Sequence, residues 1–173
     1  MRNRTSKEIQ LCEYQLKPGF IFLSREPVVI SSVLGSCVAV SLWDGKALYG
    51  GMVNYLYPSA GPGISPTAKY GNVAVKYLAG MFLQEGGNKE NIKAQLFGGA
   101  SNSKQSKMIA EENISIARGI LKKLGIKIVS EDVGGDMGRK LIYNTLTNEA
   151  IVYKTNQLRK GDWYPYYHAG RRP

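Results

Sequence analysis

The sequence predicts an α/β fold, a layered sandwich in which helices pack on a mixed β-sheet. Short apolar runs rich in β-branched residues fill the first third of the chain, and two later segments repeat apolar residues every three or four positions. The chain thus begins with several strands and continues with strands that alternate with helices. This order is expected when helices cover a sheet. The length of 173 residues suits one domain with short tails.

Strands are predicted first at residues 20–23 and 27–33, which are short apolar runs. Residues 38–43 and 48–56 then predict a β-hairpin, because Asp44-Gly45 between them is a strong turn signal. The early part of the chain is therefore expected to consist of strands.

A loop and a helix are expected next. Residues 58–66 are rich in Pro, Gly and Ser, and the run is long enough for a functional loop. Thr67 can cap a helix over residues 68–84, because its hydroxyl can accept a hydrogen bond from the first turn. Gly86-Gly87 ends this helix, as glycine commonly does after a helix C-terminus.

The rest of the chain alternates strands with a second helix. Residues 92–97 predict a strand, and residues 105–124 predict an amphipathic helix that ends at a glycine. A short strand at 126–129 follows, and a hairpin at 141–146 and 150–154 completes the pattern.

The chain divides into a flexible basic arm at residues 1–13, a domain at 14–155 and a basic, aromatic C-terminal tail at 156–173. The net charge of +10 is high for this length. Basic tails are either solvated or attracted to an acidic partner. No recognised nucleic-acid-binding fold or motif accompanies the charge, so we expect no nucleic-acid partner.

The composition also limits the cellular setting. No apolar run approaches the roughly 20 residues that a bilayer requires, and the polar N-terminus lacks the apolar segment of a signal peptide. We therefore expect a cytoplasmic protein without membrane insertion. Cys12 and Cys37 are the only cysteines, and no cluster of histidine and cysteine indicates a zinc site, so no metal or cofactor is expected.

Cys37 is the first candidate for chemistry. Gly35 and Ser36 before it permit a tight turn, and that geometry suits exposing a sulfur at the edge of a strand. The alternative is that Cys37 is a small buried hydrophobic residue, since free cysteine is among the most buried residue types. The cysteine alone favours the second interpretation, and only its surroundings favour the first.

A set of motifs occurs in order through most of the chain, from about residue 14 to residue 155. Its members are the run 31–40 around the cysteine, Gly50-Gly51-Met52, Pro58, Lys69-Tyr70-Gly71-Asn72, Phe97-Gly98-Gly99-Ala100, Asn113 and the run 132–139. Together they closely resemble the CheD family, the chemoreceptor glutamine deamidases of bacterial and archaeal chemotaxis. The resemblance implies a cysteine-dependent hydrolase frame that converts receptor glutamine to glutamate with release of ammonia.

The resemblance also implies roles for individual residues. Cys37 matches the nucleophile, and Ser31, six positions earlier, matches the orienting hydroxyl that is usually threonine in the family. The family's catalytic histidine stands shortly before a proline, and Asn54 occupies that position here. The remaining site residues that we expect to support the substrate or the surrounding loops are Ser36, Gly98, Gly99 and Arg139. For Arg139, orienting a loop is favoured over touching substrate.

Asparagine does not titrate near neutral pH and cannot serve as the general base. Three explanations stay open. The protein can be a non-catalytic member kept for binding, it can use another base, for which His168 is the one imidazole in the sequence, or Asn54 can be an engineered substitution. Val53 and Tyr57 also depart from the usual residues around the histidine, which argues against engineering.

The partners implied by the resemblance are a chemoreceptor cytoplasmic domain and a CheC-like phosphatase. The function we infer is a CheD-like protein of the chemotaxis adaptation system whose deamidase activity is weak or lost. The alternative is a non-catalytic adaptor that binds a receptor or a CheC-like phosphatase through the domain and the tail at 156–173.

Overall fold

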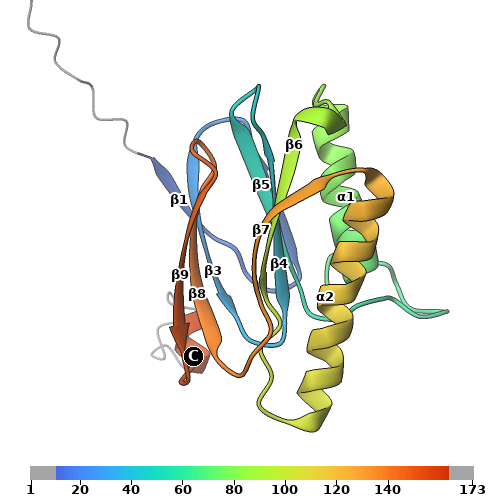
Figure 1. Ribbon diagram of the computed structural model, residues 1–173, viewed down its shortest axis with the longest axis vertical. Coiled ribbons are helices and arrows are strands. Elements are labelled where there is room, and N and C mark those ends of the chain that lie inside the picture. The colour runs from blue at the N-terminus through green and yellow to red at the C-terminus, as the bar shows by residue number, and fades with distance from the viewer. Residues whose placement is uncertain (1–10, 164–173) are drawn as a thin grey trace, which may run out of the picture.

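The computed structural model describes residues 11–163, which form three layers. Two β-sheets lie face to face, and a layer of two long helices covers one of them (Figure 1). The predicted α/β layered sandwich is therefore confirmed, with the difference that its strands form two sheets and not one. Residues 1–10 and 164–173, which include most of the expected arm and His168, lie outside the described residues.

The four-stranded sheet has the order β1-β3-β8-β9. Its strands are β1 (Cys12–Gln15), β3 (Val28–Leu34), β8 (Gly138–Asn144) and β9 (Glu149–Thr155). β1 pairs with β3 in parallel, whereas β3, β8 and β9 are antiparallel. The sheet therefore joins an early strand to the last hairpin of the chain.

The five-stranded sheet has the order β2-β5-β4-β6-β7. Its strands are β2 (Phe20–Ser24), β5 (Tyr49–Tyr55), β4 (Val38–Asp44), β6 (Ile92–Gly98) and β7 (Lys127–Val133). Only β6 and β7 are parallel, and the helix α2 provides the long connection that parallel neighbours need.

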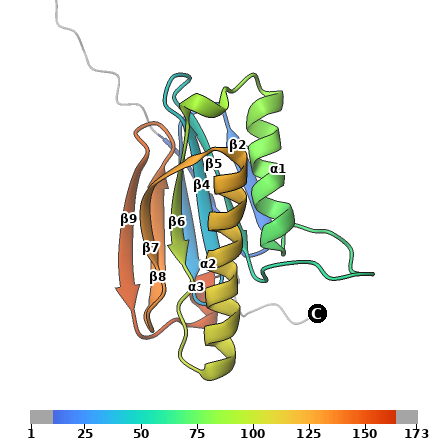
Figure 2. The ribbon, with the colours of Figure 1, turned by 45° about the vertical axis from the view of Figure 1, so that its right-hand side comes forward.

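The two long helices, α1 (Gly71–Gln84) and α2 (Lys104–Leu124), pack on the same face of the five-stranded sheet (Figure 2). A single 3₁₀ turn, η1 (Lys89–Asn91), precedes β6. A short helix, α3 (Lys160–Trp163), follows β9 and lies against β3. Residues 156–163, expected as part of a tail, thus lie against the domain.

The helix ends differ from the prediction in one place. Thr67 does not cap α1: the helix begins at Gly71, and its N-cap Tyr70 makes no side-chain capping bond. The signal of a Thr before an apolar run was misleading because the loop makes one more turn, with the Tyr70 amide donating to the Thr67 carbonyl at 3.1 Å. At α2, Ser103 caps the helix, although no cap was predicted there, and Gly125 ends it as predicted, at a φ of 71°.

Two apolar cores separate the three layers. The core between the helices and the five-stranded sheet includes Val38, Val53, Tyr55, Leu78, Phe82, Leu96 and Leu121. The core between the sheets includes Leu16, Ile30, Leu34, Cys37, Met52, Phe97 and Tyr143. Burial of each large apolar side chain contributes about 1.5–3 kcal/mol, so both cores are needed to hold the layers together.

Two parts of the sheets were not expected: the strand β1, and residues 130–133, by which β7 continues beyond its predicted end at residue 129. Cys12 and Glu13, assigned to the flexible arm, are the first residues of β1. The short run Cys12–Gln15 is mostly polar and forms a strand through its parallel pairing with Val28–Ser31, a long-range contact that local composition does not show.

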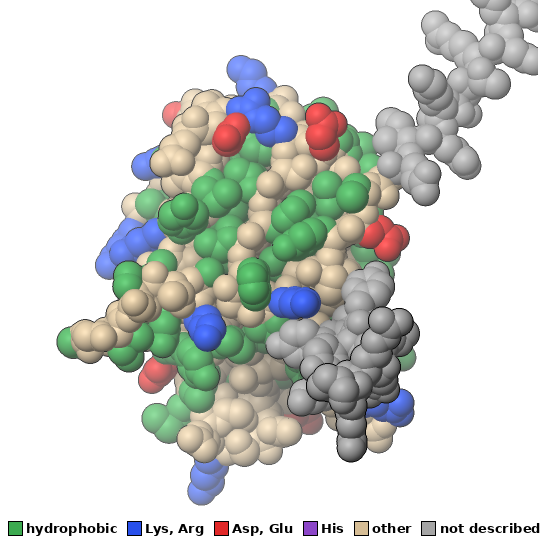
Figure 3. Space-filling model, turned by 180° about the vertical axis from the view of Figure 1, so that it is seen from behind, with side chains coloured by type: hydrophobic (Ala, Val, Ile, Leu, Met, Phe, Trp, Pro, Cys, Tyr) green, Lys and Arg blue, Asp and Glu red, His purple; other side chains and the backbone are tan. Residues whose placement is uncertain are grey.

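The surface shows no separation of charge on the side seen in Figure 3, where Lys and Arg side chains are scattered among apolar and uncharged ones. The outer face of the four-stranded sheet exposes Ile142, Ile151 and Tyr153. Within residues 11–163, none of the helices has the length and apolar character that crossing a bilayer requires.

Candidate active site

The turn between β3 and β4 carries Cys37. Two backbone amides from the segment after β6 fix this turn, because Gly99 N–H donates to the Cys37 carbonyl and Ala100 N–H donates to the Gly35 carbonyl, both at 2.8 Å. The conformation of the turn therefore depends on the loop that follows β6.

Gly98 and Gly99 are required by this close approach. Gly98 has a φ of 105°, and a Cβ there would collide with the Cys37 carbonyl oxygen. Gly99 has a φ of 67°, and a Cβ there would lie 2.7 Å from Ile114 of α2. Both glycines thus serve backbone geometry at the edge of the candidate site.

The Cys37 side chain lies between the two sheets, and the residue is 4% exposed. Its thiol donates to the Val33 carbonyl at a sulfur-oxygen distance of 3.9 Å. Burial raises the pKa of Cys37 to about 11, although hydrogen bonds from the Gly35 and Cys37 amides and from Asn54 act in the opposite direction. The exposed sulfur that the turn suggested is not what the structure shows, and at pH 7 only about one thiol in 10⁴ is ionised.

Asn54 lies on β5 and is fully buried beside this thiol. Its Nδ2 donates to Ser32 Oγ at 3.0 Å, and the Ser32 hydroxyl donates to the Leu16 carbonyl at 2.8 Å. Within residues 11–163, Asn54 Oδ1 has no hydrogen-bond partner. An amide cannot accept the thiol proton at neutral pH, so the pair lacks the proton transfer that a histidine would supply.

Ser31, the expected orienting hydroxyl, is not part of this pair. It is on the opposite face of β3, where its hydroxyl donates to Gln15 Oε1 at 2.6 Å. Successive side chains of a strand point to opposite faces, so Ile30, Ser32 and Leu34 share the inward face. Ser32 is therefore the hydroxyl that contacts Asn54. The alternation of apolar residues through Ile30 and Leu34 was the signal in the sequence that would have indicated it.

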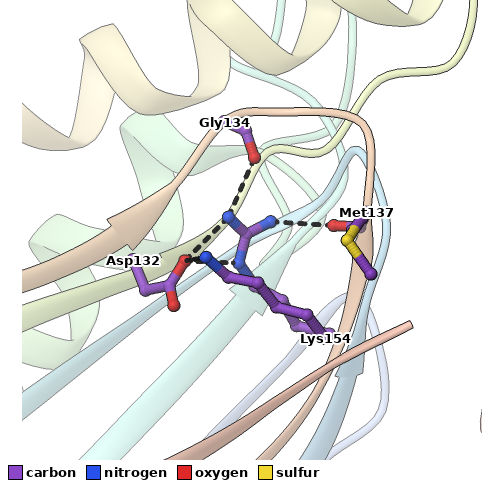
Figure 4. A network of polar contacts seen from close by, with 5 residues as sticks. Asp132, Gly134, Met137 and Lys154 are labelled. Carbon is purple, nitrogen blue, oxygen red and sulfur yellow. Dashed lines mark hydrogen bonds and ion pairs between the residues drawn. The ribbon is translucent and has the colours of Figure 1, made fainter. Parts of the chain in front are cut away.

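Arg139 on β8 has a buried guanidinium, with 3% of its side chain exposed. Its Nε and Nη2 donate to Asp132 Oδ1 at 2.9 and 2.8 Å (Figure 4). Two backbone carbonyls accept further bonds: that of Gly134 from Nη2 at 2.8 Å, and that of Met137 from Nη1 at 3.1 Å. Lys154 Nζ lies 3.2 Å from the same Asp132 oxygen. Partial burial raises the pKa of Asp132, but these cationic donors outweigh it and hold the pKa below its usual value.

The Arg139 network orders the loop between β7 and β8, and that loop in turn holds the segment after β6. The Ser101 amide donates to the Gly135 carbonyl, and the Gly134 amide donates to the Gly98 carbonyl, both at 2.9 Å. Of the two roles considered for Arg139, loop orientation is the one that its contacts support. Arg139 is linked to Cys37 through these two loops and through its pairing with Leu34, across β8 and β3.

A cleft of about 510 Å³ lies beside the turn, and Gly35 and Ser36 form part of its wall. Its other residues come from the loop after β6, the first turn of α2, the β7–β8 loop with the start of β8, and the end of β9 with the segment after it: Ala100, Ser101, Asn102, Ser106, Asp136, Gly138, Thr155, Asn156, Gln157, Leu158, Arg159 and Trp163. The Cys37 side chain does not line the cleft. A substrate in the cleft would therefore meet the turn before it meets the sulfur.

The segment 156–163 forms one wall of this cleft. Leu158 and Trp163 side-chain atoms lie 4.0 and 3.9 Å from the position of a Cβ on Gly35. The Asp162 carboxylate accepts a hydrogen bond from Lys140 Nζ at 2.7 Å. In the part of the chain described here, no group of three or more His, Cys, Asp and Glu side chains is placed to hold a metal ion.

Known proteins resemble this chain over most of its length. A family model described as CheD chemotactic sensory transduction matches residues 58–154. A probable chemoreceptor glutamine deamidase CheD from Trichlorobacter lovleyi is 40% identical over 149 residues, which cover 84% of this chain and 92% of the relative. A probable chemoreceptor glutamine deamidase CheD 1 from Methanosarcina acetivorans is 38% identical over 78% of this chain and 87% of its own length. The relative from Sulfurimonas denitrificans is 42% identical over 70% and 80%.

Among solved structures, the hypothetical protein YfiH of Bacillus licheniformis is similar at a TM-score of 0.45 and 17% identity, over 65% of this chain and 49% of that protein. This likeness is too weak to bear on function.

Proposed function

This chain belongs to the CheD family, and from that membership we propose that it acts on the cytoplasmic domain of a chemoreceptor in the adaptation system of chemotaxis. The reaction we assign to its fold is conversion of a receptor glutamine to glutamate, with Cys37 as nucleophile and a rate far below that of a histidine-containing site. The setting is accordingly cytoplasmic. The observation that carries the proposal is the buried Cys37 thiol beside Asn54.

In the proposed reaction, the Cys37 thiolate attacks the carboxamide carbon of the glutamine and forms a thioester as ammonia leaves. Water then hydrolyses the thioester to the carboxylic acid and restores the thiol. Two proton movements are needed: removal of the thiol proton, and protonation of the departing ammonia. A histidine performs both, whereas Asn54 can perform neither.

The missing acid/base and the low fraction of ionised thiol reduce the rate by comparable factors. A positioned acid/base contributes about 10²–10⁴-fold to a rate. The raised pKa of Cys37 leaves only about 10⁻⁴ of the thiol ionised at pH 7, compared with a few per cent for an ordinary cysteine. Turnover is therefore expected to be slow and to rise with pH toward 11.

The test is deamidation of a purified receptor cytoplasmic fragment, read by mass spectrometry as the mass change from amide to acid. The parent protein, Cys37→Ala, Asn54→His and the double variant Cys37→Ala/Asn54→His are compared. We expect a trace of product from the parent and at least a 100-fold gain in Asn54→His, since a base is restored. If the thiol is the nucleophile, neither protein that carries Cys37→Ala forms product.

A second candidate function is a binding module with no catalysis. It is favoured by the full burial of Asn54 and by its hydrogen bond to Ser32, because both are typical of an amide with a structural role in the core. Under this alternative, Asn54→His also yields no product while the protein still binds the receptor fragment or a CheC-like phosphatase. Deleting residues 156–173 then decides whether the C-terminal segment contributes to that binding.

A further inference from the structure

Asn113 lies in the middle of α2 and is completely buried on the face that packs against the five-stranded sheet. The other buried residues of this helix are all apolar: Ala110, Ile114, Ala117, Ile120 and Leu121. Burying a carboxamide among apolar side chains costs free energy unless its hydrogen bonds are made. The contacts of this one polar side chain are therefore informative.

The Asn113 side chain bridges two strands at the point where they separate. The last residue pair between β4 and β5 is Val38 with Tyr55, and beyond it the two chains diverge. Nδ2 of Asn113 donates to the Ser36 carbonyl at 3.1 Å and to the Leu56 carbonyl at 3.0 Å. One amide group thus connects the turn before Cys37 to the residues just after Asn54.

The helix does not need this side chain to dock. The Tyr55 hydroxyl donates to the backbone carbonyl of Asn113 at 2.5 Å, a bond that any residue at position 113 would keep. Ile114 and Leu121 provide apolar packing on the same face. The side-chain bonds of Asn113 therefore go beyond what attaches α2 to the sheet.

All three carbonyls of the nucleophile turn, Gly35 to Cys37, have a donor. Those of Gly35 and Cys37 are held by backbone amides of the loop after β6, and only that of Ser36 is held by a side chain. We propose that Asn113 is the positioning residue of this turn: it fixes the Ser36 carbonyl and thereby sets the direction and burial of the Cys37 thiol relative to Asn54. This assignment rests on Cys37 as the nucleophile of the proposed function.

With the Ser36 carbonyl held inward, the Gly35 and Cys37 amides stay directed toward the sulfur, where they favour its ionised form. Ser36 lines the cleft, so release of its carbonyl would let water from the cleft reach the thiol. Burial is the largest cause of the raised pKa, so the entry of water outweighs the loss of the two amide contacts and lowers the pKa of Cys37. Asn113 is accordingly not a catalytic residue and acts only through the turn.

The experiment measures how fast Cys37 reacts with 5,5′-dithiobis(2-nitrobenzoate) between pH 7 and 11. Cys12 is exposed, so every protein carries Cys12→Ser. Asn113→Asp removes the donors and places a carboxylate against two carbonyl oxygens, whereas Asn113→Leu removes them without adding charge. In Asn113→Leu we expect the apparent pKa of the Cys37 thiol to fall from about 11 toward the ordinary value of 9.0. In Asn113→Asp the fall should be smaller, because a nearby negative charge opposes ionisation of the thiol. At a pH below the thiol pKa, each unit by which that pKa falls raises the thiolate fraction, and with it the labelling rate, about tenfold.

The matched controls are Gln95→Glu and Gln95→Met. Gln95 is a buried amide on β6 whose Nε2 donates to the Asn148 carbonyl at 2.8 Å, so it makes the same kind of bond without touching the turn. Thermal unfolding of all variants corrects for a general loss of stability. Faster labelling and a lower thiol pKa at position 113 only, at equal stability, would support the proposal.

Slow labelling with an unchanged pKa in Asn113→Leu, or the same acceleration in the Gln95 variants, would overturn it. Because the assay follows the thiol and uses no receptor, this result is separate from the outcome for deamidation. Absence of product in Asn54→His would argue against the proposed function and leave the role of Asn113 in the turn standing.

Discussion

Asn54 Nδ2 donates to Ser32 Oγ at 3.0 Å, and this bond joins the facing strands of the two sheets inside the core. The site that the family resemblance assigns to a histidine therefore holds an amide with a defined partner. The side-chain oxygen of Asn54, Oδ1, has no hydrogen-bond partner among residues 11–163. The position is thus polar and ordered, and it lacks a group that could take a proton at neutral pH.

Ser32→Ala should destabilise the protein by about 1–3 kcal/mol, because the buried Asn54 amide would lose its acceptor and the Leu16 carbonyl its donor. Ser31→Ala is the matched control, since that hydroxyl bonds Gln15 on the outer face. Urea unfolding of both variants measures the difference. Equal losses would mean that the inward hydroxyl has no special role in holding Asn54.

Stability should decrease in alkali because of Cys37. Burial raises the pKa of the folded thiol to about 11 from 9.0, so the unfolded chain loses this proton first. The stabilising contribution is complete below pH 9 and is lost as the pH rises from 9 to 11, by about 1.4 kcal/mol per unit and about 3 kcal/mol in total.

Cys37→Ser isolates this contribution, since Tyr55 and Tyr143 also have pKa values raised by burial and remain in the variant. The difference in free energy of unfolding between parent and Cys37→Ser should narrow from pH 9 to pH 11. A difference that stays constant over that range would show that the thiol is open to water in the folded state.

Local patterns were enough to predict the β4–β5 hairpin and α2, because a turn signal or a period of apolar residues marks each of them. The separation into two sheets was not predictable in the same way. It depends on β3 pairing with β8, more than a hundred positions later, and on the parallel addition of the mostly polar β1. Such pairings leave no mark in a local window.

In the candidate site, the resemblance placed Cys37 and Asn54 together, and the structure brings both into one buried region. The resemblance assigned the orienting hydroxyl to Ser31, whereas in the structure Ser31 bonds Gln15 and Ser32 is the hydroxyl that contacts Asn54. Burial of the thiol could not be read from a turn that suits exposure equally well. The role of Asn113 depends on contacts with Ser36 and Leu56, which only the folded chain brings together.

Leu158→Ala should cost about 1–2 kcal/mol, because Leu158 is half-buried and packs against Gly35 and Gly138 at the wall of the cleft. Gln157→Ala, at an exposed neighbouring position, should change stability by less than about 0.5 kcal/mol. Chemical unfolding of the full chain compares them. If both substitutions are neutral, residues 156–163 are not an energetic part of the domain, and the boundary expected at residue 155 is the better one.

Arg139→Met should destabilise the protein by about 2–4 kcal/mol. Among residues 11–163, the substitution leaves Asp132 with Lys154 as its one remaining cation, and it removes the donors of the Gly134 and Met137 carbonyls. Arg118→Met is the matched control, because Arg118 also makes two bonds to one carboxylate, that of Glu131, while half of its side chain is exposed. That loss should stay below about 1 kcal/mol.

The pH dependence of the Arg139 effect distinguishes the ion pair from simple packing. The pKa of Asp132 is lowered in the folded protein, so its stabilising contribution is present above the ordinary carboxyl pKa of 3.8 and is lost as the pH falls through the lower folded value. The difference in free energy of unfolding between the parent and Arg139→Met should therefore narrow in acid, as urea unfolding at a series of pH values would show. A difference that is constant down to pH 2 would assign the loss to packing of the arginine side chain, and the loop between β7 and β8 would then hold its shape without the carboxylate.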